Sequence, residues 1–474
     1  MRSWDRLFIG GEWVEPSSSS RIDVISPHTT ELVAHCPEAS TADVDRAVEA
    51  AGRAFDSGPW PQLPPNERLS VVQRLHDLYT ANMTEMGLLI TEEMGSPISF
   101  GQAGAAWMTL KTMLSIAETY PWEERRSGAF GEVLVRREAV GVVAAIVPWN
   151  VPQFIIMNKI GPALLAGCTV VLKPAPEAPL DALYLAEMVE QAGFPPGVFN
   201  VVPAGREVSE YLVSHPGIDK VAFTGSTATG RRIGSICGSQ LKRCSLELGG
   251  KSAAIVLDDA DLNVVADGLK AASFMNSGQA CVAQTRVLAS RANYGNVVDA
   301  LAEMTQGLTV GDPSDPATDI GPLVAQRQQE RSEEYINVGQ QEGAKIVVGG
   351  NGLPAGLSRG WYVRPTLFAD ATNTMRISRE EIFGPVVTVI PFDDVDDAVH
   401  IANDSDYGLA GSVWTADHDA GVDVARRIRT GTLGINKYGM DMAAPFGGFK
   451  QSGLGRELGP EGLTAFVEYK SIAL

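Results

Sequence analysis

The chain has few of the residues that disulfide-rich or metal-binding proteins need. Its 474 residues include only five cysteines and six histidines, without a C-x-x-C or an H-E-x-x-H pattern. An odd, sparse set of cysteines gives no disulfide framework, and the missing patterns give no zinc site. We therefore expect no metal ion and a reducing, cytoplasmic location.

Positive charge and long hydrophobic runs are also scarce. Against 38 Lys and Arg stand 57 Asp and Glu, for a net charge of −19. Nucleic acid is therefore excluded as a partner, because phosphate binding needs a basic surface. The longest apolar run, Ala139–Val147, is about half of a membrane span, and the first residues lack a signal-peptide core. We expect neither a membrane partner nor secretion.

Strands and helices alternate through most of the chain, which predicts βαβ units and a parallel sheet. The first series has strands at 140–147, 168–172, 198–202, 219–223 and 241–247, and helices at 152–166, 179–192, 206–214 and 227–238. The second starts near Ser252 and has helices at 261–276, 393–404 and 418–429, and strands at 286–289, 363–368, 386–391, 411–414 and 432–436. We predict an α/β protein with two such domains joined near Gly249-Gly250.

The remaining segments flank these two series. Residues 1–40 read as short extended pieces, and helices are expected at 41–55, 66–94 and 97–117, the first with Thr41 as its N-cap. A charged hairpin at 121–138 leaves the body of the domain, and a strand at 465–474 is expected to reach a partner subunit.

The stretch 272–286, A-S-F-M-N-S-G-Q-A-C-V-A-Q-T-R, places Cys281 after a small-residue turn and before a buried strand. A thiolate is the reactive form of cysteine, and a turn containing Gly278 lets a substrate approach closely. Taken alone, the stretch is better explained by an inert buried cysteine, because free cysteines are among the most buried residues.

Four strand ends carry further polar groups. The turn F-T-G-S-T-A-T-G at 223–230 opens a helix whose N–H groups suit a pyrophosphate, although the spacing of its glycines is not G-x-G-x-x-G. Glu247, Asn150 and Lys173 follow other strands, where open α/β sheets bind their ligands. A general base and an oxyanion donor are possible roles for the first two. Each has an ordinary structural explanation as well: a turn, a paired carboxylate, a loop amide.

Taken together, the motifs resemble the aldehyde dehydrogenase superfamily over essentially the whole chain. They occur in the family's order: F-I-G-G-E-W (8–13), P-W-N-V-P (148–152), K-P-A-P-E (173–177), F-T-G-S-T (223–227), E-L-G-G-K (247–251), G-Q-A-C (278–281), E-I-F-G-P-V (381–386) and P-F-G-G-F-K-Q-S-G-L-G-R-E (445–457). The resemblance is to the non-phosphorylating, hydrolytic type that uses NAD or NADP.

The resemblance implies a catalytic set. Cys281 would attack the aldehyde carbon, and the resulting oxyanion would be held by the Asn150 side chain and the Cys281 backbone N–H. After hydride transfer, Glu247 would activate the water that hydrolyses the thioester. Lys159 and Glu457 match positions thought to relay that proton. A CoA-acylating enzyme is an alternative, which the presence of Glu247 opposes; a non-catalytic structural protein on this fold is another.

The resemblance also implies an NAD site, with NADP left open. Its expected residues are Ile146, Pro148, Trp149, Lys173, Pro176, Glu177, Phe223, Gly225, Ser226, Gly230, Leu248, Gly249, Glu381 and Phe383. Many NAD-preferring relatives carry Glu three residues after the lysine, whereas this chain has Pro176 there and Glu177 one later. We still favour NAD, because the sequence offers no obvious arginine for a 2′-phosphate.

Finally, the family pattern predicts the substrate tunnel and the assembly. Val151, Ile155, Met275, Val282 and Phe446 would line the tunnel, and Asn158 stands at an often aromatic position, so an apolar aliphatic or aromatic aldehyde is expected. The expected parts are a dinucleotide-binding domain (1–120 and 139–250), a catalytic domain (251–447) and an oligomerisation arm (121–138 and 465–474) of a homodimer or homotetramer.

Overall fold

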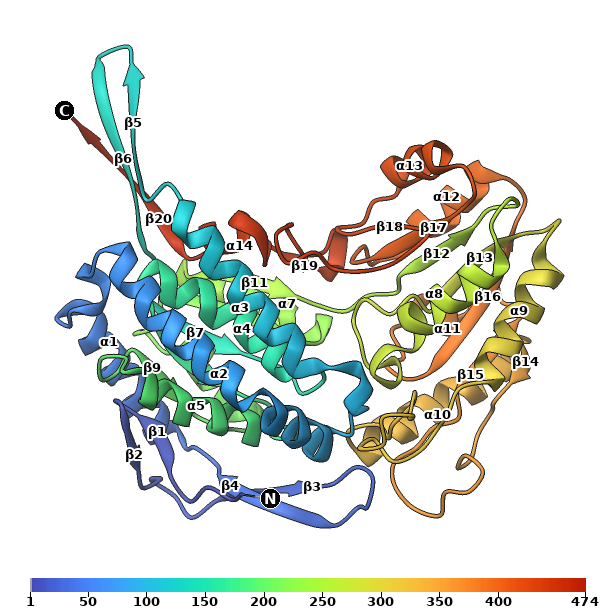
Figure 1. The fold of residues 1–474 in the computed structure, drawn as a ribbon, viewed down its shortest axis with the longest axis horizontal. Coiled ribbons are helices and arrows are strands. Elements are labelled where there is room, and N and C mark those ends of the chain that lie inside the picture. Colours follow the sequence, from blue (N-terminus) through green and yellow to red (C-terminus); the bar gives the residue numbers. More distant parts are fainter. Residues whose placement is uncertain (1) are drawn as a thin grey trace.

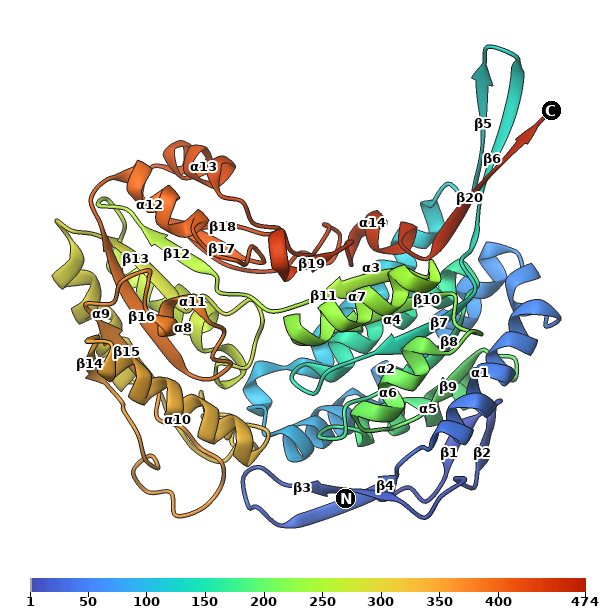
Figure 2. The ribbon, with the colours of Figure 1, turned by 180° about the vertical axis from the view of Figure 1, so that it is seen from behind.

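The computed structural model describes residues 2–474, in which two large sheets lie side by side with helices on both faces of each (Figure 1). The view from behind shows the same arrangement (Figure 2). Each sheet forms one lobe together with its helices, and Cys281 lies where residues of the two lobes meet.

The first sheet has eight strands within residues 2–474, in the order β19-β11-β10-β7-β8-β9-β1-β2. Its five central strands are parallel: β7 (Val142–Ile146), β8 (Thr169–Lys173), β9 (Phe199–Val201), β10 (Lys220–Thr224) and β11 (Arg243–Glu247). The antiparallel edge strands are β1 (Leu7–Ile9), β2 (Glu12–Val14) and β19 (Gly453–Leu454). The predicted parallel sheet is confirmed, with strand ends displaced by at most two residues.

Helices cover the two faces of this sheet with separate apolar cores. One face is covered by α2 (Pro65–Met94), α3 (Gln102–Thr119), α4 (Pro152–Ala166) and α5 (Leu180–Ala192), and the other by α1 (Thr41–Asp56), α6 (Arg206–Ser214) and α7 (Thr227–Gln240). The short 3₁₀ turns Trp60–Gln62 and Ile98–Phe100 adjoin α2. The prediction of Thr41 as the N-cap of the first helix is wrong. Ser40 is the cap, because its hydroxyl accepts from the Asp43 N–H while the Asp43 carboxylate accepts from the Ser40 N–H.

The second sheet has the order β14-β15-β16-β13-β12-β17-β18, and only β14 is antiparallel to its neighbour. Its strands are β12 (Ala253–Val256), β13 (Arg286–Ser290), β14 (Lys345–Val348), β15 (Thr366–Ala369), β16 (Val386–Phe392), β17 (Gly411–Trp414) and β18 (Gly434–Ile435). The helices around it are α8 (Leu262–Phe274), α9 (Tyr294–Gln306), α10 (Gln326–Gln341), α11 (Arg376–Arg379), α12 (Val395–Asn403) and α13 (His418–Arg427). The 3₁₀ turn Lys450–Ser452 and α14 (Gly459–Thr464) come later in the chain, and α14 packs on α3 and α4 of the first lobe.

Five elements of the second lobe have no counterpart among the predicted helices and strands: α9, α10, α11, β12 and β14. In α10 the buried side is narrow and made of Ser332, Tyr335, Ile336 and Gly339, so the apolar stripe that marks a helix is nearly absent. The helix predicted at 261–276 ends at Phe274 instead, and a tight turn, Met275–Gly278, follows it.

A three-stranded sheet projects from the first lobe (Figure 1). It consists of β5 (Glu123–Gly128), β6 (Gly131–Ala139) and the last strand, β20 (Val467–Ala473), which pairs antiparallel with β6. A separate hairpin is formed by β3 (Arg21–Ile25) and β4 (Leu32–Pro37). The predicted hairpin at 121–138 is present, whereas its use in oligomers and the exact domain limits stay predictions.

No helix in residues 2–474 combines the length and the apolar character that crossing a membrane requires. Within the same residues, no group of three or more His, Cys, Asp or Glu side chains is arranged to hold a metal ion.

Candidate active site

A cavity of about 230 Å³ contains Cys281 and draws its walls from both lobes. All five residues predicted to line a substrate tunnel do line it, together with Asn158 and the predicted catalytic residues Asn150, Glu247 and Glu457. Most of the remaining wall is apolar: Phe100, Ala105, Phe154, Ala280, Tyr438, Met440 and Met442. The tertiary structure therefore gathers side chains from widely separated segments around one thiol.

The turn before Cys281 is held in an unusual backbone conformation. Asn276 and Ser277 have φ angles of 50° and 59°, in the left-handed region that non-glycine residues seldom occupy. The Ser277 hydroxyl accepts from the Gly321 N–H at 2.9 Å and donates to the Gly321 carbonyl at 3.0 Å. Gly278 has no room for a side chain, because a Cβ there would lie 2.3 Å from the Gly384 carbonyl group. These contacts fix the position of the thiol, and such strain is typical of functional sites.

A network of buried amides connects this turn to the loop after β7. The Asn150 Nδ2 donates to the Gln279 carbonyl at 2.9 Å, and the Asn276 Nδ2 donates to the Asn150 carbonyl at 2.8 Å. Gln102, from α3, donates to the same Asn150 carbonyl at 3.0 Å. Because a primary amide has two N–H groups, Asn150 keeps a second donor for the cavity.

The sequence analysis missed two members of this network. Asn276 lies within the stretch that drew attention to Cys281, and asparagine is one of the few residues that tolerate the left-handed region, so it could have been identified. Gln102 offered no such signal, because its contact with Asn150 arises only when α3 packs on α4.

Glu247 enters the cavity as a buried carboxyl group with neither oxygen hydrogen-bonded within the described residues. Burial and the nearby negative charge of Glu457 raise the pKa of Glu247 well above its usual range. Burial, Glu381 and Glu247 likewise raise the pKa of the Cys281 thiol to about 12. At neutral pH the Cys281 thiol therefore keeps its proton, and burial favours the protonated form of Glu247.

Lys159 and Glu457 form an ion pair behind Glu247. The Lys159 Nζ lies 2.5 Å from the Glu457 Oε1, and both side chains are buried. Glu457 lines the cavity, whereas Lys159 contacts it only through Glu457. The pair thus places a carboxylate and an ammonium beside Glu247, and these are groups that could pass a proton along.

Two larger cavities, of about 580 Å³ and 510 Å³, adjoin the thiol site. The first is lined by Ile146, Pro148, Lys173, Pro176, Glu177, Phe223, Gly225 and Ser226, and the second by Trp149, Leu248, Gly249, Glu381, Phe383 and Cys281. Apart from Gly230, every residue predicted to bind the dinucleotide is in these sets.

The groups around these cavities fit a dinucleotide. Ser226 caps the N-terminus of α7, whose free N–H groups and positive end suit a pyrophosphate. The rings of Trp149 and Phe383 meet edge-on, with centroids 5.4 Å apart, and form an apolar wall. The Glu381 carboxyl accepts from the Gly250 N–H at 3.0 Å, and burial raises its pKa to about 7. One cleft thus contains a site for an anion, an apolar wall and a carboxyl group that can accept hydrogen bonds from hydroxyl groups.

Gly230 lies outside both cavities and has a packing role. A Cβ at this position would lie 2.4 Å from the Leu248 side chain, so only glycine lets α7 approach β11 closely. Thr224, which the sequence analysis did not single out, lines all three cavities, and its hydroxyl has no partner within residues 2–474.

The sequence offered no obvious arginine as a partner for the 2′-phosphate of NADP, but the structure brings three arginines to the cofactor cleft. Arg206, Arg232 and Arg327 all line the 580 Å³ cavity. Arg327 forms an ion pair with Glu177, and Arg232 lies 2.7 Å from Glu210. Arg327 belongs to α10 in the other lobe, and sequence order gave no indication that it would reach Glu177.

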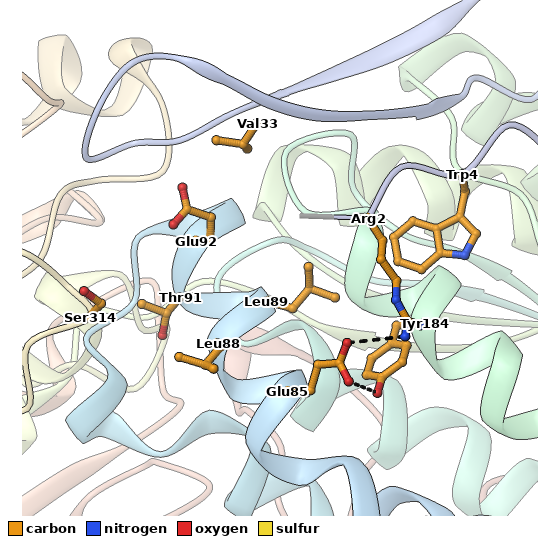
Figure 3. A pocket seen from close by; sticks show the side chains of 10 residues that line it. All are labelled: Arg2, Trp4, Val33, Glu85, Leu88, Leu89, Thr91, Glu92, Tyr184 and Ser314. Carbon is orange, nitrogen blue, oxygen red and sulfur yellow. Dashed lines mark hydrogen bonds and ion pairs between the residues drawn. The ribbon is translucent and has the colours of Figure 1, made fainter.

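A further cavity, of about 540 Å³, lies away from this site, among the N-terminal segment, α2 and α5 (Figure 3). Its main polar contacts join Tyr184 to Glu85, with the hydroxyl donating at 2.8 Å, and Arg2 to Glu85, at 3.7 Å. It contains none of the predicted site residues, so the candidate active site is the one around Cys281.

Comparison with known proteins gives a consistent result. The model of the aldehyde dehydrogenase family matches residues 13–472. Geranial dehydrogenase of Castellaniella defragrans is 47% identical over 99% of this chain and 98% of its own length. A crystal structure of a Mycobacterium tuberculosis aldehyde dehydrogenase complexed with NAD⁺ is 49% identical, with a TM-score of 0.98 over 100% of this chain and 98% of that one. Aldehyde dehydrogenase C of Pseudomonas syringae, in a mutant crystallised with NAD⁺ and octanal, is 41% identical, with a TM-score of 0.96 over 99% and 96% of the two chains.

Proposed function

The chain belongs to the aldehyde dehydrogenase family, and we propose that it oxidises an apolar aldehyde to the carboxylic acid with NAD. The observation that carries this proposal is the convergence of Cys281, Asn150 and Glu247 on one apolar cavity beside a dinucleotide-sized cleft. These are a nucleophile, an oxyanion donor and a base, which are the groups that covalent aldehyde oxidation requires.

In the first half of the reaction, the Cys281 thiol releases its proton to solvent, and its sulfur forms a bond with the aldehyde carbon as the C=O π bond opens, which gives a thiohemiacetal. The free N–H of the Asn150 amide and the Cys281 backbone N–H stabilise the negative charge that develops on the aldehyde oxygen. The Asn276 and Gln102 amides hold the Asn150 backbone and thereby orient that donor. Bound NAD supplies the hydride acceptor, and the enzyme retains the acyl group as a thioester on Cys281.

In the second half, Glu247 in its carboxylate form takes a proton from water, which attacks the thioester carbon and releases the acid and the Cys281 thiolate. The Lys159–Glu457 ion pair stands beside Glu247 and can carry its proton away from the cavity. A CoA-acylating reaction needs no such base, so the buried carboxyl favours hydrolysis. A cytoplasmic location also remains a prediction, based on the sparse cysteine content.

The substrate class follows from the cavity wall, which is almost wholly apolar near Cys281. Apart from Thr224 and the catalytic groups Asn150, Glu247 and Glu457, the polar side chains of this wall are Asn158 and Gln102, whose Oδ1 and Oε1 are buried without partners within the described residues. The cavity presents no cationic side chain to a charged substrate tail. Geranial and octanal, which appear in the names of similar proteins, are apolar aldehydes and support the same assignment.

We therefore expect hexanal, octanal and benzaldehyde to be oxidised with a kcat/KM at least about tenfold higher than succinic semialdehyde or betaine aldehyde. Burying an unpaired charge in an apolar cavity costs more than this ratio requires. The measurement is NADH formation at 340 nm over this panel of aldehydes. A preference for either charged aldehyde would refute the substrate class, and absence of turnover with the whole panel would refute the proposed function.

The cofactor preference is expected to depend on Glu177. Its carboxylate lies on the wall of the 580 Å³ cavity and is paired with Arg327. A carboxylate there repels a 2′-phosphate, and in Glu177→Gln the freed Arg327 would attract one. We expect this variant to raise the ratio of kcat/KM for NADP to that for NAD by about tenfold.

The matched control is Glu207→Gln, which removes the same charge from the exposed surface of α6 outside the cavity wall. It should leave the ratio unchanged. A wild-type KM for NADP below that for NAD would contradict the proposed preference, whatever the variants show.

A further inference from the structure

Helix α7 lies beside β11 in Figure 2, and the packing of the helix on this strand brings Cys237 and Cys244 onto facing surfaces. At the start of the helix, Gly230 abuts Leu248, and one turn later Gly234 faces Leu246, 3.6 Å from where its Cβ would lie. Four residues of a helix advance about 6 Å, and two residues of a strand advance about 6.6 Å. Because α7 and β11 run in opposite directions with nearly equal steps, facing residues stay paired along both elements. Three residues further along the helix, Cys237 is its next buried residue, and two residues back along the strand Cys244 lies on the same face of the sheet as Leu246 and Leu248.

Other observations agree with this register. Both side chains belong to the apolar cluster on this face of the sheet, Cys237 within it and Cys244 packed against it. Each thiol is also the largest influence on the pKa of the other. The connection between them is short and tight, because the Lys242 N–H donates to the Cys237 carbonyl at 2.9 Å.

The two thiols differ in their exposure and acidity. Cys244 is half-buried, whereas Cys237 is fully buried. The neighbouring Cys237 thiol and the charge of Lys220 lower the pKa of Cys244 to about 6, and the interaction with Cys244 and burial raise the pKa of Cys237. By contrast, burial raises the pKa of Cys168 to about 11 and that of Cys281 to about 12. Since the thiolate is the form that reacts with oxidants, Cys244 is the thiol expected to react first.

We propose that Cys244 and Cys237 form a redox pair that a hydroperoxide converts reversibly into a disulfide. The Cys244 sulfur attacks the peroxide, the O–O bond breaks, and a sulfenic acid forms as hydroxide or alkoxide leaves. The Cys237 sulfur then attacks the Cys244 sulfur, the S–S bond forms, the S–O bond breaks, and water leaves with the Cys237 proton. The pair loses two electrons in total, and the peroxide gains them. A dithiol reverses the reaction by thiol–disulfide exchange.

A disulfide needs the two sulfurs to approach to a bond length of about 2.05 Å. Cys237 lies in the last turn of α7, next to Gly238 and before the exposed, left-handed Leu241. Cys237 is at the opposite end of α7 from Ser226, and Cys244 precedes Glu247 by three residues on β11. The disulfide would therefore form without altering the catalytic cavity, and it would give hydroperoxides a faster target than Cys281.

The test is intact-mass analysis and peptide mapping of the reduced protein after treatment with equimolar hydrogen peroxide. We expect the wild type to lose the two thiol hydrogens and to yield a cross-linked peptide containing both cysteines, which dithiothreitol separates. Cys237→Ser should instead accumulate oxygen on Cys244, and Cys244→Ser should resist this fast oxidation. Oxidation of Cys281 before Cys244, or a wild type that gains oxygen without cross-linking, would overturn the proposal.

Two additional measurements test the proposal even if a variant misfolds or the proposed function is wrong. Alkylation of the wild type by iodoacetamide, followed residue by residue, should label Cys244 first with a midpoint near its lowered pKa; uniform labelling would contradict the proposal. If the proposed activity holds, the wild type should also lose dehydrogenase activity to peroxide several-fold more slowly than Cys244→Ser. The mass and alkylation results do not depend on that activity, so either proposal can fail without the other.

Discussion

Replacing Cys281 with alanine is expected to reduce NADH formation from octanal by about 10⁴-fold or more, because the covalent route then has no nucleophile. No other cysteine can substitute. Cys36 and Cys168 are buried in the first lobe, and Cys237 and Cys244 lie on the opposite face of its sheet. The measurement is steady-state absorbance at 340 nm with saturating NAD and octanal.

Two controls separate lost chemistry from a lost site. Cys36→Ala removes a buried thiol from β4, outside every cavity wall described above, and should keep activity within about twofold of the wild type. Cys281→Ala itself should bind NAD with nearly unchanged affinity, measured by fluorescence titration, because the cofactor cleft is otherwise intact. If the alanine variant retained a tenth of the wild-type rate, the covalent mechanism would be wrong.

Replacing Glu247 with glutamine is expected to slow steady-state turnover by about 10²- to 10⁴-fold while leaving the first turnover visible. Gln fills the same volume in this buried position but cannot take a proton from water. Acyl-enzyme should then accumulate, so rapid mixing with NAD and octanal should give a burst of NADH close to one per active site. Mass spectrometry of the quenched protein should find the acyl group on Cys281.

The pH dependence provides a second measure of the same group. Because burial and Glu457 raise the pKa of Glu247, its carboxylate form increases as the pH rises, and the wild-type hydrolysis rate should rise with it. The Cys281 thiol also has a raised pKa, so the burst rate should rise toward alkaline pH in both proteins. Glu247→Gln should lose only the rise in steady-state turnover. A variant that hydrolyses its thioester at the wild-type rate would show that Glu247 is not the base.

Much of the fold could be predicted from local sequence patterns. The strands β7, β8 and β10 are short apolar runs between turns, and α4 begins at the Pro152 that opens its helical pattern. The prediction failed where local patterns are weak. The polar helix α10 is stabilised by only a few buried residues, and Thr41 precedes Asp43 so closely that only the hydrogen bonds identify Ser40 as the cap.

By itself, the sequence determined the alternation of strands and helices, the order of the motifs and the residues that stand at strand ends. These properties depend on neighbours a few positions away, and parallel strands necessarily bring their carboxyl ends to one edge of the sheet. Asn150 and Glu247 stand at such strand ends, and it is the resemblance of all the motifs to one family that identifies these two residues and Cys281 as catalytic candidates.

Only the tertiary structure decided which distant groups meet. It placed Gln102 against the Asn150 carbonyl, Arg327 against Glu177, and Cys237 beside Cys244. It also placed Gly230 outside the cleft, where it packs on Leu248. It also buried Glu247 and Cys281 deeply enough to raise the pKa of both groups. Contacts between lobes and the loss of solvent around a charge depend on how the whole chain packs, and no local pattern records either.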